Sequence, residues 1–294
     1  MRKETVVQGH HDVHQRYFSN WLEFVQLAER VKNESNGTYF NGMNCSSLRS
    51  GQRDWSGTSS LGEAIDLAYT GWPEGRSRLE RLREKLAIER LLPTSQRIRE
   101  FRDVSGDEPN VDLFLCGEPE HMVTLEEVAL RQGGKLIHIC VNRSAASSVS
   151  SERITRRGLA LLIAIETLMV LGYSLELSIM QSVKSKYEPE YFDIMIPVLH
   201  AGDPISMDSF AFLLMHPAVL RRLIFAAEET EDDRLRRSFG FNNGYYGTPK
   251  DPLVKPDCDL FMNWEDGLIY DDDEVVPFAL SILKRVGIDT SRAA

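Results

Sequence analysis

A strand that runs directly into a long apolar helix restricts the fold of this chain more than any other feature. The segment LIHICVN, residues 136–142, is apolar on both faces, as a central strand buried within a sheet would be. Residues 151–171 predict a helix that is apolar on nearly every side after Gly158, so it must pack against that sheet. The two elements together indicate an α/β protein.

The segments that follow continue this pattern. Further strands are expected at 173–180, 191–200 and 257–264, and further helices from Met207 and over 273–288. Pro217 lies inside the helix that starts at Met207 and should kink or split it. The order β-α-β-β-α-β-α predicts a Rossmann-like, three-layer fold with helices on both faces of the sheet.

The front of the chain has a different character. Residues 1–131 predict a mainly helical region with a connector, and residues 132–294 the α/β domain. His10, His11 and His14 are expected in a flexible terminus where they bind nothing, and the alternative is a metal-binding cluster. After residue 102, two Glu-Pro steps indicate a turn-rich connector.

Two helices are expected near the front because good N-cap residues precede segments with helical spacing. The candidate caps are Ser19 or Asn20 for the first helix and Ser59 or Ser60 for the second. Pro73 pushes Trp72 out of the α region, so the second helix should end there. We expect the Trp72 indole to pack back on Leu67 or Ala68.

One basic segment stands out in an acidic chain. The chain carries 34 basic and 44 acidic residues, a net charge of −10, which argues against a broad surface for nucleic acid. Residues 76–102 predict a charged helix, broken by Pro93, with nine positive and four negative side chains. Its Glu–Arg spacing fits a solvated, salt-bridged face, and the alternative is nucleic-acid contact through Arg78, Arg81 and Arg83.

Polar residues follow the first predicted strand, at the end where open α/β sheets bind ligands. The strand order and the Ser-rich loop at 142–148 resemble a von Willebrand factor A domain, in which an Asp-x-Ser-x-Ser motif helps to hold Mg²⁺. On this resemblance Asn142 takes the Asp place and Ser144 the first Ser place. Ala146 takes the second Ser place, with Ser147 one residue further on.

This resemblance implies Asn142, Ser144 and Ser147 as metal ligands, with a carboxylate from the fourth strand region. Asp259 is the main candidate for that carboxylate, and Asp257 and Asp266 are the others. Because an amide replaces the motif's carboxylate, a loop that binds no metal is the first expectation and Mg²⁺ the alternative. A Ser-rich helix start is also a place where an anion can bind.

The sequence lacks a complete catalytic set. There is no GxxxxGK[ST] or GxGxxG motif, and no Ser has a positioned His partner in the sequence. His138 is expected inside the sheet, and nothing in the sequence brings His200 or His216 to the loop. We therefore expect a protein that is not an enzyme and binds no cofactor.

Four segments are similar to an uncharacterised family of phage and prophage proteins: SGTSSLGEAI at 56–65, GWPEG at 71–75, GEPEHM at 117–122 and the Ser-rich loop that leads to Arg157 and Gly158. The resemblance spans residues 55–225. It implies an adaptor of a phage or mobile element that binds a protein partner, in DNA replication, packaging or virion assembly.

The expected compartment is the cytoplasm, that of the bacterial host for a phage protein. The four cysteines are widely spaced and form no CxxC pair, which favours reduced thiols in the core. The longest apolar run, residues 158–173, is shorter than the roughly 20 residues of a membrane span and contains Glu166.

Overall fold

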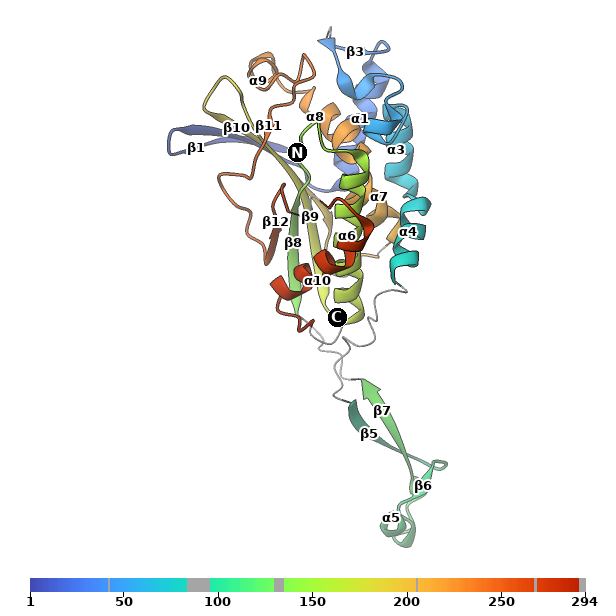
Figure 1. Ribbon diagram of the computed structural model, residues 1–294. Coiled ribbons are helices and arrows are strands. Elements are labelled where there is room, and N and C mark those ends of the chain that lie inside the picture. The colour runs from blue at the N-terminus through green and yellow to red at the C-terminus, as the bar shows by residue number, and fades with distance from the viewer. Residues whose placement is uncertain (42, 84–95, 130–134, 205, 267–268, 291–294) are drawn as a thin grey trace.

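A computed structural model describes the chain except for residues 42, 84–95, 130–134, 205, 267–268 and 291–294 (Figure 1). Seven strands form a mixed sheet in the order β1-β2-β10-β9-β8-β12, with β11 paired to β9. The strands are β1 Arg2–Gln8, β2 His11–Tyr17, β8 Leu136–Asn142, β9 Ser174–Lys184, β10 Glu190–Leu199, β11 Thr248–Pro249 and β12 Leu260–Met262. The four strands expected from the second half of the sequence are confirmed.

Strand β8 lies between two parallel neighbours, β9 and β12. Strand β10 pairs antiparallel with β9 and parallel with β2, and β1 closes the edge as the antiparallel partner of β2. Helix α6, Ser151–Val170, provides the crossover from β8 to β9. The unit that the sequence indicated first therefore lies inside the sheet, with β8 next to the edge strand β12 and β9 next to β10.

The helices match the expected caps and breaks. The longer ones are α1 Trp21–Glu34, α3 Leu61–Thr70, α4 Pro73–Arg83, α6, α7 Met207–Met215, α9 Asp233–Phe239 and α10 Val275–Arg285. Asn20 and Ser60 accept hydrogen bonds from Glu23 N at 2.9 Å and Glu63 N at 3.1 Å. At Pro217 the chain turns by 69° between α7 and the following helical segment.

The remaining elements are short and lie mainly in the connections between the longer ones. They are α2 Arg53–Ser56 and α8 Phe225–Glu228, a π-helix over Val219–Ile224, 3-10 helices over Ser46–Leu48 and Asp272–Glu274, and a hairpin of β3 Tyr39–Phe40 with β4 Met43–Asn44.

Helices cover one face of the sheet, and the second expected layer of helices is not found in the described chain. Ile139, Ile179 and Ile194 point from neighbouring strands into one apolar core shared with α6. Figure 1 places the long helices on that side. The opposite face carries polar side chains such as Ser178 and Asp193, which an apolar helix could not cover.

The N-terminus is part of the sheet, which corrects the expected flexible terminus and the mainly helical front region. Strand β2 pairs with β10 over six positions, and His14 is buried. The hydrophobic core also contains Phe24 from α1 and Leu162 from α6. The expected division between residues 131 and 132 therefore does not separate two cores.

Residues 96–129 form a separate small unit, which we call the β5–β7 unit. Strands β5 Gln96–Asp103 and β7 Met122–Ala129 are antiparallel, β6 Glu108–Pro109 pairs with β7, and α5 spans Val111–Leu115. Residues 96–102 were expected to continue the charged helix and instead form a strand. The rest of that expected helix after Arg83, residues 84–95, lies outside the described residues.

Among the described residues, no single helix is long and apolar enough to cross a membrane. One bent pair, α7 with residues 219–228, meets the length and composition of a span only when its two parts are joined.

Gly158 sets how closely α6 approaches α7. A Cβ atom at this position would lie 1.9 Å from the Leu214 carbonyl oxygen, so the two helices would have to move apart. We expect Gly158→Ala to lower the free energy of unfolding by about 1–3 kcal/mol or more, as overpacking does. Urea unfolding measures this.

Gly62→Ala is the matched control for that substitution. Its Cβ would meet the flexible end of Lys32 at 3.3 Å and Ser60 Oγ at an ordinary contact distance of 3.6 Å. Alanine favours a helix by up to about 1 kcal/mol over glycine, so this variant should be as stable as the parent or more so. Equal stability for the Gly158→Ala variant would contradict the close approach of the helices.

Candidate functional site

A crevice of about 570 Å³ opens beside the carboxyl end of β8 and the last residues of β9. This is the edge of an open α/β sheet where ligands bind. Its walls come from the loop after β8, from residues 46–55 and from residues 244–249. The volume lies within the roughly 300–1,000 Å³ that small-molecule sites occupy.

Aromatic rings form much of the wall. Tyr246 stacks on Phe225, with ring centroids 3.7 Å apart and planes 6° apart. The Trp55 indole donates a hydrogen bond to the Ser147 carbonyl oxygen at 3.2 Å, so it holds the Ser-rich loop. Tyr245 remains 40% exposed at the mouth, and its hydroxyl lies 2.8 Å from Thr248 Oγ1.

Arginines supply the charge of the crevice. The Arg221 guanidinium lies 4.4 Å from the Trp55 ring centroid and donates to the carbonyl oxygens of Trp55 and Val149. Arg49 lines the crevice from the loop of residues 46–55, and its side chain forms no ion pair within the described chain. Arg222, behind that loop, donates to four carbonyl oxygens of residues 47–58.

No acidic side chain lines the crevice within the part of the chain that the structure describes. Two buried carboxyl groups, Glu228 and Glu229, lie behind its wall. Burial raises the pKa of both groups, and Glu229 also accepts hydrogen bonds from Ser47 and Tyr246.

The backbone around the crevice is unusual. Two non-glycine residues in its wall, Gln52 and Tyr246, have φ near +57°. Such conformations are uncommon for side-chain-bearing residues and gather at functional sites. The hydrogen bond from Tyr246 to Glu229 and its stacking on Phe225 hold this conformation.

Asn142 and Ser144, two of the expected metal ligands, lie together but bond inside the protein. Asn142 Nδ2 donates to the Lys250 carbonyl oxygen at 2.9 Å, and Asn142 Oδ1 accepts from Ser144 N at 3.0 Å. Ser144 Oγ donates to the Ser182 carbonyl oxygen at 2.8 Å. These side chains fasten the loop to β9 and to residue 250, while Ser147 is exposed at the crevice.

Asp259 is not brought to this loop. Its carboxylate accepts from His138 N at 2.8 Å, four residues before Asn142 along β8, which corresponds to roughly 13 Å at about 3.3 Å per residue. Asp266 bonds instead to Asn263 N and Arg285. The described residues contain no group of three His, Cys, Asp or Glu side chains that could hold a metal. Mg²⁺ binding by the expected set stays a prediction, and this geometry does not favour it.

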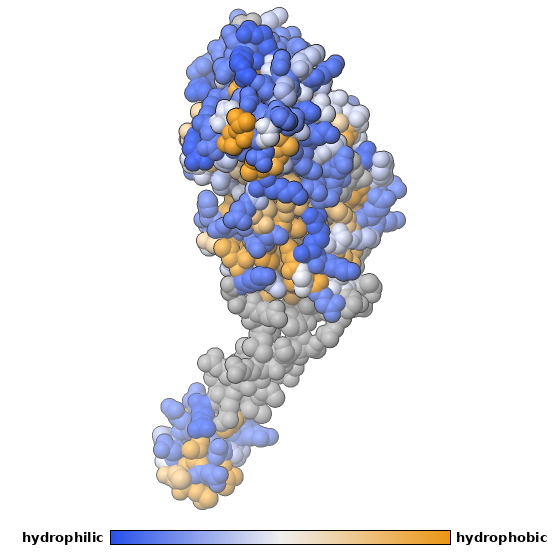
Figure 2. Space-filling view, turned by 90° about the vertical axis from the view of Figure 1, so that its left-hand side faces the viewer, coloured by the Kyte–Doolittle hydropathy of each residue, from blue (hydrophilic) through white to orange (hydrophobic). Residues whose placement is uncertain are grey.

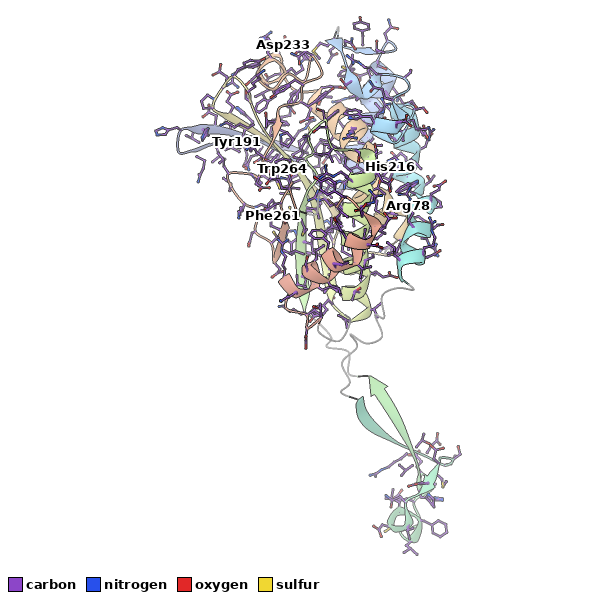
Figure 3. All side chains as sticks on the ribbon, in the orientation of Figure 1. Arg78, Tyr191, His216, Asp233, Phe261 and Trp264 are labelled. Atoms are coloured by element: carbon purple, nitrogen blue, oxygen red, sulfur yellow. The ribbon has the colours of Figure 1, made fainter. Side chains whose placement is uncertain are left out.

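The residues expected to contact nucleic acid lie on α4, away from the crevice. Arg78 forms an ion pair with Glu152 at 2.9 Å (Figure 3), Arg81 donates to the Ser77 carbonyl oxygen at 3.2 Å, and α4 ends at Arg83. Nucleic-acid contact through this helix also stays a prediction.

Trp72 closes the end of α3 as expected, but the structure shows a different contact for its ring. The chain leaves the helix at Gly71, and the indole meets the His216 ring edge-on at 4.7 Å. Burial lowers the pKa of His216 to about 4, so this ring is neutral at physiological pH.

A second cavity, of about 360 Å³, lies on the polar face of the sheet below residues 254–257. Asp193 lines it, and neither of its carboxylate oxygens has a hydrogen-bond partner within the described chain. Burial raises the pKa of Asp193 to about 6, although nearby Ser182 and Gln15 act in the opposite direction.

The mixed sheet with helices on one face, joined to a crevice at its carboxyl edge, defines an α/β protein. The chain belongs to a family described as "Domain of unknown function (DUF7192)", whose model matches residues 3–289. The match crosses the β5–β7 unit and both expected domains. No curated protein and no solved structure matches the chain. The comparisons show neither a von Willebrand factor A likeness nor a phage origin.

Asp193 predicts a pH dependence of stability. A carboxyl with a pKa near 6 in the fold and 3.8 when unfolded favours folding while protonated. Its contribution is complete below pH 3.8 and is lost as the pH rises through 6. A difference of about two pKa units corresponds to about 3 kcal/mol.

Between pH 4 and pH 7.5 the free energy of unfolding of the parent should therefore decrease by this amount through Asp193. In the Asp193→Asn variant, which cannot ionise here, the decrease should be smaller by the same amount. Urea unfolding at several pH values measures this, with Asp257→Asn from the same cavity as the control. Parallel pH profiles of the parent and the Asp193→Asn variant would count against the assignment.

Proposed function

We propose that the protein is a non-enzymatic interaction protein that binds a protein partner through α5. The observation that carries this proposal is the exposure of three apolar side chains on one short helix. Val111, Phe114 and Leu115 are 61%, 60% and 76% exposed, and we call them the α5 surface. Figure 2 shows apolar residues gathered at the end of the β5–β7 unit, which contains α5.

Exposed apolar groups of this size commonly mark interaction sites. A three-stranded sheet with a five-residue helix offers little surface of its own to cover them. Phe114 meets only the edge of the His121 ring, at 5.1 Å between ring centroids. An apolar helix face of this kind fits into a groove on a partner.

The charge of the β5–β7 unit indicates what the partner offers. Residues 96–129 contain nine acidic and three basic side chains. A negatively charged unit around an apolar tip suits an apolar groove with a basic rim, and it would be repelled by an anionic lipid surface. The proposed partner is therefore a protein with such a groove.

The setting that we propose is an adaptor of a phage or mobile element, in DNA replication, packaging or virion assembly. It rests on the resemblance of short sequence segments within residues 55–225 to phage and prophage proteins. The cytoplasm is the proposed compartment, which agrees with four free cysteines that include the exposed Cys116.

The test compares two surface variants of the full chain. Leu115→Ser with Phe114→Ser removes the α5 surface, and Val7→Ser with Tyr187→Ser removes two equally exposed apolar side chains elsewhere. Loss of two interface anchors should weaken a partner complex by at least about tenfold. Quantitative co-purification from expressing cells, followed by titration of the recovered partner, measures this.

Both variants should melt like the parent, because the changed side chains are exposed. Retention of every partner by the α5 variant would refute the proposal, as would equal loss from both variants.

A further inference from the structure

We propose that the crevice beside β8 and β9 binds a small anion joined to a planar ring, the chemistry of a nucleoside monophosphate. This site is independent of the α5 surface. No bound group marks it, so the inference depends on the charge, rings and polar atoms of its wall.

The charge of the wall is positive and lacks a carboxylate partner. Arg49 and Arg221 line the crevice, and Arg143 and Arg222 are buried behind it. In the described chain none of the four forms an ion pair within 4.0 Å, and three of them donate instead to main-chain carbonyl oxygens. Cations held away from water with only neutral partners attract an anion strongly.

Arg49 is the residue suited to contact the anion directly. The guanidinium of Arg221 is already engaged by two carbonyl oxygens, whereas that of Arg49 has no hydrogen bond to the described residues. Its planar fork of N–H donors matches two oxygens of a phosphate or carboxylate. Ser46, Ser147 and Thr248 add hydroxyl groups to the same walls.

The rings of Trp55 and Tyr245 suit the planar part of the ligand. They lie in two different loops of the same crevice, and Tyr245 is open to the mouth. Bases stack favourably on aromatic side chains, whatever their sequence identity. The position of Trp55 is set by its bond to Ser147 and by Arg221, so little ordering is required on binding.

Gln181 provides an unpartnered acceptor in the wall. Its side chain is buried, and its Oε1 atom has no hydrogen-bond donor among the described residues. Glu228 is a neighbour whose pKa the Gln181 side chain lowers, against the stronger effect of burial. An amino or imino group on the ring would satisfy the Gln181 oxygen, since a buried acceptor without a donor is costly.

The experiment titrates the full chain with AMP, GMP, CMP and UMP and follows tryptophan fluorescence and calorimetric heat. Inorganic phosphate, adenosine and anthranilate are the other probes; they carry the anion alone, the ring without the anion, and a ring carboxylate. We expect saturable binding of at least one ring-bearing anion. Phosphate and adenosine should each bind at least about tenfold more weakly, since each forms only part of the contacts. Whether a monophosphate or anthranilate binds more tightly then identifies the anion.

Two variants separate the site from general charge. Arg49→Gln removes a guanidinium that bonds to nothing else described, so it should reduce affinity at least about tenfold without lowering the melting temperature. Arg76→Gln removes an exposed arginine from α4 and should leave binding unchanged. Tyr245→Leu should weaken the ring-bearing anions but not inorganic phosphate.

Absence of saturable binding by every ring-bearing anion up to about 5 mM would overturn the proposal, because that limit corresponds to only about 3 kcal/mol of affinity. Equal effects of the Arg49→Gln and Arg76→Gln variants would overturn it as well, since binding would then follow overall charge rather than this crevice.

Discussion

Hydrogen bonds from buried guanidinium groups to main-chain carbonyl oxygens hold the loops of this protein in place. The clearest case is Arg222, whose two terminal nitrogens reach the carbonyl oxygens of Ser47, Arg49, Gly51 and Thr58. The segment between these residues has only α2 and the end of a 3-10 helix, Ser46–Leu48, to pair its backbone. Buried backbone groups need partners, and one arginine supplies four of them.

Other arginines repeat this arrangement around the crevice. Arg143 joins the loop after β8 to the carbonyl oxygens of Leu214 and His216 at the break after α7. Burial lowers the pKa of Arg143 to about 9 and that of Arg221 to about 10, so both remain charged at neutral pH. Arginine suits both positions, because the two terminal nitrogens of its guanidinium reach two separate carbonyl oxygens, whereas lysine has one nitrogen. The crevice therefore acquires its positive potential from the same residues that shape it.

The sequence predicted the parts of the fold that local patterns determine. Asn20 and Ser60 cap helices as expected, and Pro217 breaks the chain as expected, since each acts on its immediate neighbours. Strands β1 and β2 were missed because RKETVVQ and HDVHQRY lack a regular apolar alternation; β10 supplies the pairing. The strand over 96–102 was mistaken for helix because charged residues separate its few apolar ones.

The crevice could not be predicted from local sequence patterns, because its walls come from segments that lie far apart in the sequence. Trp55, Arg221 and Tyr245 meet only through the tertiary fold. The run GYYG at 244–247 was the one local signal, since glycines flanking two tyrosines indicate a tight loop that presents rings. The Ser-rich loop was predicted as a candidate metal site. In the structure its Asn142 and Ser144 form hydrogen bonds within the protein and so position one wall of the crevice.

The two proposed binding sites, the crevice and the α5 surface, belong to different parts of the structure. The crevice combines segments from residues 46–55, 145–147, 221–225 and 244–249, and Phe225 and Tyr246 in its wall belong to the main core. A ligand there would stabilise the whole fold by mass action, since unfolding any wall destroys the site. The α5 surface belongs to a small sheet with strands β5, β6 and β7 of its own. A partner at the α5 surface would contact none of the residues that line the crevice. Binding at one site can therefore change the affinity of the other only if it alters the conformation of a segment that both sites share.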